Sequence, residues 1–153
     1  MSNNPSIKNL IPYLLRSLLS GMAVTLMLSA PLQSHAVEII THPSNDTREL
    51  PISTLRSIFS NRMTRWPDGT PIRVFVMGEK DPLHSQFCKQ ILGVFPHQLR
   101  RAWNRMIYSG TGQEPTRVDN ELEMYSRVQS TPGAIGYLSD RQENEKIRII
   151  EIE

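Results

Sequence analysis

Cysteine is nearly absent from this sequence, and its scarcity limits how the chain is stabilised. Cys88 is the only cysteine among 153 residues, so an internal disulfide and a thiolate zinc cluster are both excluded. We interpret the histidines that follow residue 36 as surface or cap residues and predict no metal site and no cofactor. These histidines are His42, His84 and His97. We therefore expect a hydrophobic core to stabilise the fold.

Acidic residues are absent from the first 36 positions, which carry Lys8 and Arg16 ahead of an apolar stretch at 17–32. This pattern, followed by small residues, is typical of a secretory signal peptide. We predict a signal peptide at 1–36, cleavage between Ala36 and Val37, and a periplasmic domain with no stable membrane insertion. The alternative is an uncleaved anchor, although the apolar stretch is shorter than the roughly 20 residues of a spanning helix.

Net charge is absent once the leader is removed, because the loss of its two positive charges leaves 15 basic against 15 acidic side chains. This balance removes the general electrostatic attraction for nucleic acid, and we predict no nucleic-acid partner. The basic stretch Leu99–Arg105 is interpreted as a solvated helix face or a docking face for an acidic protein. Residues 37–153 suffice for one compact domain.

Strands alternate with helices along the chain, which predicts an α/β domain with a mixed β-sheet flanked by about four helices. The final strand carries charge on alternate residues and is expected at a sheet edge. Ser53, Asp81 and Asp119 are the expected N-caps, and Cys88 is expected in the core. The predicted strands are 37–42, 72–77, 133–138 and 146–153, and the predicted helices are 53–59, 81–92, 96–107 and one that begins after 119.

Two separated motifs carry a resemblance to a known family. The first, LRSIFSNRMTRWPDGTPIRVFV, contains Ile58-Phe59 in a helix, a turn at Trp66–Gly69 and the strand Ile72–Met77. The second, VQSTPGAIGYLSD, carries the strand segment Pro132–Tyr137. In this order they resemble the phosphate-type periplasmic substrate-binding proteins of ABC importers. The resemblance implies a single lobe of the type II periplasmic-binding-protein (PBP) fold, without the second lobe that closes over a ligand.

The family's anion-binding Ser-Gly-Thr is absent from the position that the resemblance assigns to it. The matching positions are Asp81, Pro82, Leu83 and His84, and Met77 stands where the family carries an arginine. A carboxylate repels phosphate, proline has no N–H, and leucine has no hydroxyl. The Ser-Gly-Thr at 109–111 instead follows a predicted helix, with Gly110 as its left-handed cap, so we interpret it as a helix stop.

These observations predict an exported, non-enzymatic, single-lobe accessory or protein-interaction module with a degenerate anion site. It would contact a protein partner, or itself as a homodimer, through the face that the missing lobe would cover. The alternative is a solute-binding component of an ABC importer that captures phosphate or another small anion, either as a single lobe or as a dimer of lobes. A hydrolytic triad of Asp81, His84 and Ser85 is disfavoured because no elbow glycines surround Ser85, and His84 is expected at a solvated helix start.

Overall fold

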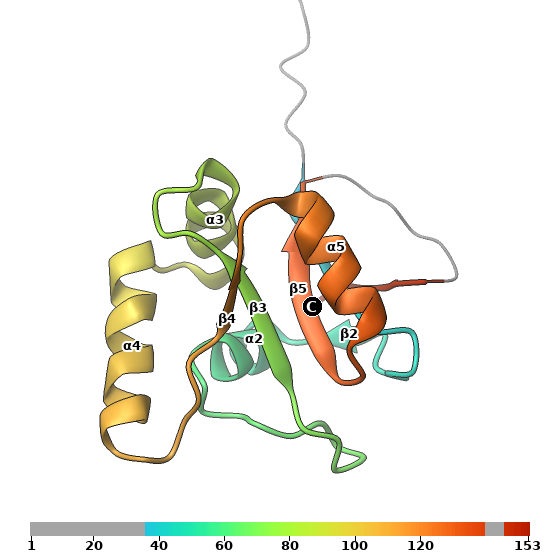
Figure 1. Cartoon of the computed structure of the whole chain (residues 1–153), viewed down its shortest axis with the longest axis horizontal. Helices are drawn as coiled ribbons and strands as arrows, with labels where there is room; N and C mark the ends of the chain where they lie inside the picture. Colours follow the sequence, from blue (N-terminus) through green and yellow to red (C-terminus); the bar gives the residue numbers. More distant parts are fainter. Residues whose placement is uncertain (1–35, 140–145) are drawn as a thin grey trace, which may run out of the picture. The chain divides into compact units, whose positions relative to one another are not determined.

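The computed structural model describes residues 36–139 and 146–153, so the predicted leader lies outside the described residues except for Ala36. Six strands form a mixed sheet in the order β2-β6-β1-β5-β3-β4. Figure 1 labels β2, β3, β4 and β5 of this sheet. β1 pairs antiparallel with β5 and β6, and the other neighbouring strands are parallel. The strands are β1 (Glu38–Thr41), β2 (Glu49–Leu50), β3 (Arg73–Met77), β4 (Thr116–Val118), β5 (Ala134–Leu138) and β6 (Arg148–Ile152). The predicted α/β class and mixed sheet are confirmed.

Helices pack on both sides of the central strand β5, all five residues of which are buried. Gly136 faces α5, since a Cβ added there would meet the side chains of Met124 and Val128. Tyr137 faces the opposite side, where its ring stacks on Phe87 with the centroids 4.1 Å apart. The described helices are α2 (Ile52–Phe59), α3 (Pro82–Gln86), α4 (Pro96–Tyr108), α5 (Glu121–Ser130) and the π-helical segment η3 (Phe87–Leu92). Four α-helices agree with the prediction.

The single helix predicted for 81–92 is α-helical only to Gln86 and continues as η3. A π-helix has a longer turn than an α-helix, and such segments are difficult to predict from periodicity. Leu92 at the end of this segment lies in the same hydrophobic core as Phe87 and Cys88, and all three residues are at most 1% exposed. Gly93 then ends the segment with φ +64°. The burial of Cys88 matches the prediction.

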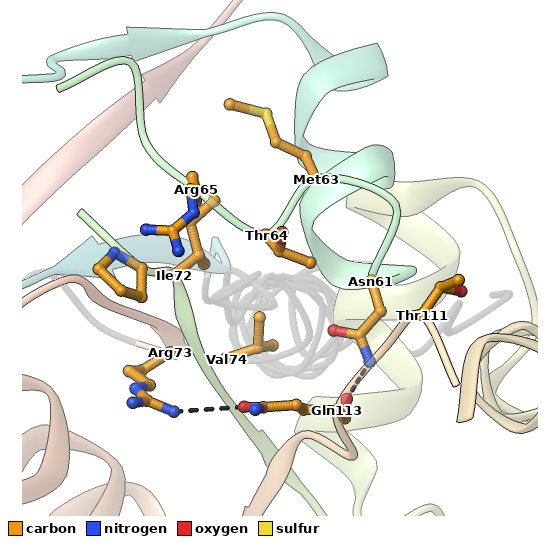
Figure 2. Close-up of a pocket in the computed structure, with 10 residues that line it drawn as sticks. Asn61, Met63, Thr64, Arg65, Ile72, Arg73, Val74, Thr111 and Gln113 are labelled. Atoms are coloured by element: carbon orange, nitrogen blue, oxygen red, sulfur yellow. Dashed lines mark hydrogen bonds between the residues drawn. The ribbon is translucent and has the colours of Figure 1, made fainter. Parts of the chain in front are cut away.

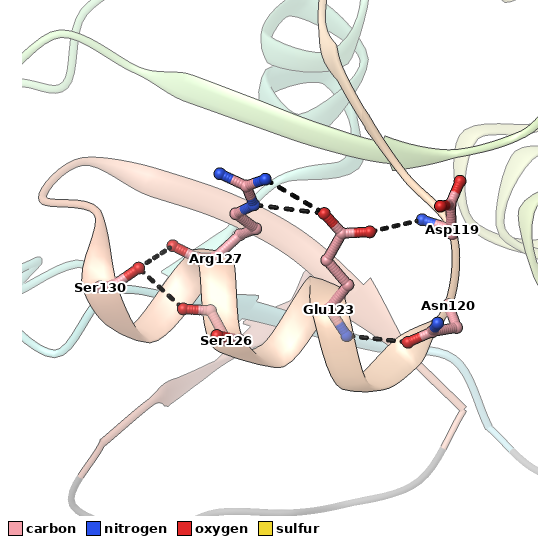
Figure 3. Close-up of polar contacts among 6 residues, drawn as sticks. All are labelled: Asp119, Asn120, Glu123, Ser126, Arg127 and Ser130. Carbon is pink, nitrogen blue, oxygen red and sulfur yellow. Dashed lines mark hydrogen bonds and ion pairs between the residues drawn. The ribbon is translucent and has the colours of Figure 1, made fainter.

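The N-cap of α5 is Asn120, so the prediction of Asp119 was wrong by one residue (Figure 3). The Asn120 Oδ1 accepts the N–H of Glu123 at 2.9 Å, and the Glu123 carboxylate accepts the N–H of Asp119 at 2.9 Å. This second hydrogen bond is the largest cause of a lowered pKa at Glu123, to which Arg127 also contributes. The side chains of Asn120 and Glu123 therefore accept two backbone N–H groups at the start of α5, much as in a capping box.

Two further local predictions were wrong. The helix α2 begins at Ile52 with Pro51 as its N-cap, and no side chain caps it, so Ser53 lies inside the first turn. The final strand β6 is not an edge strand, because it lies between β1 and the two-residue strand β2. β2 and β4 form the edges, and both are too short to leave a periodic signal in the sequence.

The Trp-x-x-Gly turn is anchored to the sheet by its tryptophan. Trp66 is buried, and its Nε1–H donates to the carbonyl oxygen of Gly133 at 3.0 Å. Gly133 has φ +77°, and a Cβ there would collide with the Pro71 carbonyl oxygen. Gly110, with φ +71°, follows α4 in the left-handed conformation expected of a helix stop. The two motifs of the sequence therefore contact each other directly.

Candidate functional site

The junction between β3 and α3 carries Met77 and the segment 81–84, the positions that the family resemblance assigned to an anion site. Asp81 caps α3, as predicted: its Oδ1 accepts the N–H groups of Leu83 at 2.8 Å and His84 at 3.1 Å. Pro82 is the first helical residue and offers no N–H. The first-turn donors that would bind an oxyanion are therefore occupied by the protein's own carboxylate.

Met77 and Leu83 close this junction with apolar side chains. Both are buried, at 3% and 9% exposure. The backbone N–H of Met77 donates to the Tyr137 hydroxyl at 2.8 Å and points into the core. Neither side chain supplies a hydrogen-bond donor to an anion. The two positions contribute packing in this lobe.

His84 is only 1% exposed, so the expectation of a solvated helix start was wrong. Its Nδ1 lies 2.7 Å from the Tyr137 hydroxyl, and its Nε2 lies 3.5 Å from the Cys88 Sγ. Because the Tyr137 oxygen already accepts the Met77 N–H, all three groups are satisfied when the Tyr137 hydroxyl donates to Nδ1. The Nε2 then carries the imidazole proton and faces the thiol. The signal missed in the sequence was the spacing of His84 and Cys88, which lie four residues apart on one helical face.

The buried network is held in its neutral, unreactive state. Burial lowers the pKa of His84, an effect that Arg117 reinforces and Asp81 and Glu79 oppose. Burial also raises the pKa of Cys88 to about 12 and raises the pKa of Tyr137. A thiol at this pKa is not a nucleophile near neutral pH. Both ring nitrogens of His84 face Tyr137 and Cys88, so the imidazole is not positioned as a base for Ser85.

Cationic side chains surround an open depression of about 770 Å³ beside the junction. Lys80 follows β3, Arg117 lies on β4, and Arg100 lies on α4. Arg100 is paired with Glu79 at 3.0 Å, and its side chain is half exposed. This depression lies at the carboxyl ends of the parallel strands β3 and β4, where α/β sheets usually bind ligands. The remaining basic side chains have the correct charge for an anion but lie outside the helix N-terminus.

Among the described residues, no group of three or more His, Cys, Asp or Glu side chains is placed to hold a metal ion. In the same part of the chain, no helix has the length and apolar composition needed to cross a membrane.

A family model described as the PBP superfamily domain matches residues 20–149. The chain belongs to the PBP superfamily. No curated protein matches the sequence. The relationship extends over both motifs and over the β3–α3 junction.

Solved structures with the fold of this PBP-superfamily lobe include phosphate-binding components of transporters. One, described as a phosphate ABC transporter substrate-binding protein from Clostridium perfringens with bound phosphate, has a TM-score of 0.60 and 19% identity, over 76% of this chain and 44% of that chain. PstS from Borrelia burgdorferi has a TM-score of 0.60 and 16% identity, over 76% and 47%. An ABC-type phosphate transport receptor from Vibrio cholerae has a TM-score of 0.59 and 15% identity, over 76% and 46%. The chain spans less than half the length of each.

Proposed function

We propose that this PBP-superfamily lobe is an exported, periplasmic, non-enzymatic module that acts through protein interaction and has lost the anion site at its family position. The capping of α3 by Asp81 is the observation that carries the proposal. A bound phosphate at this position would have to displace that carboxylate or accept its repulsion. The buried, neutral state of His84 and Cys88 supports a non-enzymatic role.

The electrostatic cost of placing phosphate beside Asp81 is about half of the binding free energy of a micromolar ligand, which is about 8 kcal/mol. Two like charges about 4 Å apart near a protein surface repel by about 4 kcal/mol. Since about 1.4 kcal/mol corresponds to a tenfold change in affinity, a micromolar phosphate site would become millimolar or weaker. The loss of the Pro82 N–H adds to this effect.

A protein partner, or a second copy of the chain, would contact the face that a second lobe covers in longer relatives. This lobe spans only 44–47% of the solved structures described above. A two-lobed fold buries one lobe against a ligand and the other lobe, so the same face is a natural contact surface in a single lobe. We place it at the carboxyl ends of β3 and β4.

Isothermal titration calorimetry with inorganic phosphate tests the loss of the anion site. We expect no binding tighter than about 1 mM in the unmodified protein, and a gain in affinity in Asp81→Ser. The matched control is Asp119→Ser, which changes an exposed carboxylate outside the junction and should leave phosphate binding unchanged. Phosphate binding tighter than about 10 µM in the unmodified protein would overturn the proposal.

Analytical ultracentrifugation and crosslinking in the periplasm test the interaction role. We expect either a concentration-dependent homodimer or a specific crosslinked partner. A strict monomer that crosslinks to no specific protein would contradict this part of the proposal.

A second candidate function is the capture of phosphate or another small anion by the basic depression, as a solute-binding component of an ABC importer. The positions of Lys80, Arg100 and Arg117 around one open surface favour it. Three results together would support this candidate over the first. Anion binding should weaken with added salt, it should be abolished in the double variant Lys80→Ala/Arg117→Ala, and it should persist in Asp81→Ser.

A further inference from the structure

A separate pocket of about 310 Å³ lies at the amino-terminal end of β3, away from the β3–α3 junction (Figure 2). Three segments that are distant in the sequence form its walls. They are the chain after α2 (61–65), the start of β3 with the two residues before it (71–74), and the loop after α4 (111–113). The volume falls at the lower end of the range of small-molecule sites.

Hydrogen bonds hold these three segments together. Asn61 follows α2 in the left-handed conformation, with φ +61°, and its side-chain amide donates to the backbone carbonyl oxygen of Gln113. The N–H groups of Thr111 and Gly112 donate to the Met106 carbonyl oxygen at 3.1 and 3.0 Å. The pocket wall is therefore fixed on two sides before any ligand binds.

Two arginine side chains line the pocket and are themselves positioned by hydrogen bonds. The Arg73 Nη1 donates to the Gln113 side-chain oxygen at 3.3 Å, and the Arg65 Nη1 donates to the Gly69 carbonyl oxygen at 2.9 Å. In this view, both guanidinium groups lie at one side of the pocket (Figure 2). A guanidinium carries five N–H donors, so these bonds leave other donors on each arginine for a ligand.

The pocket combines positive charge with apolar wall. None of its ten lining residues is acidic. Met63, Ile72 and Val74 supply apolar surface, and Thr64 supplies a further polar side chain. The Thr111 hydroxyl is hydrogen-bonded to the Ser109 hydroxyl at 2.7 Å. A planar guanidinium matches a carboxylate in a bidentate geometry, and the apolar wall matches a short hydrocarbon body.

The carboxyl-terminal ends of two helices lie close to the pocket in the chain. α2 ends at Phe59 and α4 ends at Tyr108, just before two of the segments that form the pocket. Carboxyl-terminal helix ends carry partial negative charge, and phosphate sites typically use the opposite, amino-terminal ends. This partial charge opposes every anion in proportion to the anion's charge, and the attraction of the two arginines scales in the same way. Selection of an organic carboxylate over phosphate therefore rests on the apolar wall, which gains hydrophobic contact only with a hydrocarbon body.

We propose that the pocket between Arg65 and Arg73 binds a small organic carboxylate with a short apolar body. The proposal goes beyond the function proposed above and does not depend on it, because the pocket shares no residue with the β3–α3 junction or with the basic depression.

Calorimetry of the purified protein with benzoate, hexanoate, acetate and inorganic phosphate tests the proposal. We expect benzoate or hexanoate to bind with a dissociation constant of about 1 mM or tighter, acetate to bind more weakly, and phosphate to bind most weakly. The proposal would be overturned if no carboxylate binding is detected at 10 mM ligand, which is about tenfold above the expected dissociation constant. Phosphate binding at this pocket as tight as that of benzoate would also overturn the proposal.

Substitutions locate the binding. Arg65→Gln and Arg73→Gln should each weaken benzoate or hexanoate binding by about tenfold, and Arg73→Lys should restore only part of it because lysine lacks the bidentate fork. The matched control, Arg101→Gln, removes an exposed arginine of α4 that does not line the pocket, and it should bind like the unmodified protein. Equal affinities in Arg65→Gln, Arg73→Gln and Arg101→Gln, in variants with unchanged melting temperatures, would overturn the assignment. Neither result bears on phosphate binding at Asp81, so the two proposals fail independently.

Discussion

The Tyr137 hydroxyl is expected to stabilise the fold well beyond its size, and Tyr137→Phe isolates its contribution. The hydroxyl accepts the Met77 N–H and bonds the His84 Nδ1, at 2.8 and 2.7 Å, and all three residues are at most 3% exposed. The aromatic ring is unchanged in phenylalanine, so its stacking on Phe87 is retained and no cavity forms. The variant therefore removes only the hydrogen bonds.

The expected loss of stability follows from the two groups left without partners. A buried polar group without a hydrogen-bond partner costs about 1–3 kcal/mol. With one N–H and one imidazole nitrogen affected, we expect Tyr137→Phe to lower the free energy of unfolding by about 2–6 kcal/mol. For a urea m-value of about 2 kcal/mol per molar, the unfolding midpoint falls by about 1–3 M.

Urea unfolding followed by circular dichroism measures this loss. The matched control is Tyr108→Phe, because Tyr108 is 88% exposed, and its free energy of unfolding should change by less than about 0.5 kcal/mol. A loss below about 0.5 kcal/mol in Tyr137→Phe would refute the network as a source of stability, and would show that Met77 and His84 find other partners.

Two further outcomes are expected from buried positions. Burial lowers the pKa of His84 below the ordinary histidine value of 6.5, so protonation favours the unfolded state. The contribution of His84 to stability is therefore present above pH 6.5 and is lost as the pH falls. In His84→Gln, the free energy of unfolding should decrease less steeply between pH 7.5 and pH 5, a range that runs from about one unit above to about one and a half units below the usual histidine pKa. The His42 titration is present in both proteins. Parallel stability curves for the two proteins would therefore contradict the role of His84. Gly133→Ala should lower the free energy of unfolding by more than about 2 kcal/mol, because it combines φ +77° with a collision against the Pro71 carbonyl oxygen. Gly69→Ala shares the left-handed φ, at +89°, but has no atom within 4 Å, so thermal unfolding should show a loss of only about 1 kcal/mol, and equal losses in the two variants would rule out the collision.

Local patterns in the sequence predicted the features that depend on neighbouring residues. The Asp81-Pro82 pair predicted the start of α3, and the apolar spacing of α4 predicted a helix at 96–107, which the structure extends by one residue. Caps, turns and periodicity arise from contacts within one or two turns of chain, so they are visible without the fold.

The errors fall where a partner elsewhere in the chain decides the outcome. β6 became an internal strand because Glu49–Leu50 pairs with it, and a two-residue strand has no period of its own. His84 was expected in solvent but is buried under the Tyr137 of β5, which lies 53 residues away. Polarity alone does not predict burial when a buried polar partner compensates the cost.

The sequence by itself determined the two motifs that carry the family resemblance and the Asp81-Pro82 start of α3, because each is a matter of residue identity at a local position. Only the tertiary structure decided that His84, Cys88 and Tyr137 form one buried network and that Arg65 and Arg73 share a pocket. Both arrangements join segments from different elements. Such contacts form only when the sheet and its helices have packed, and no short stretch of sequence carries that information.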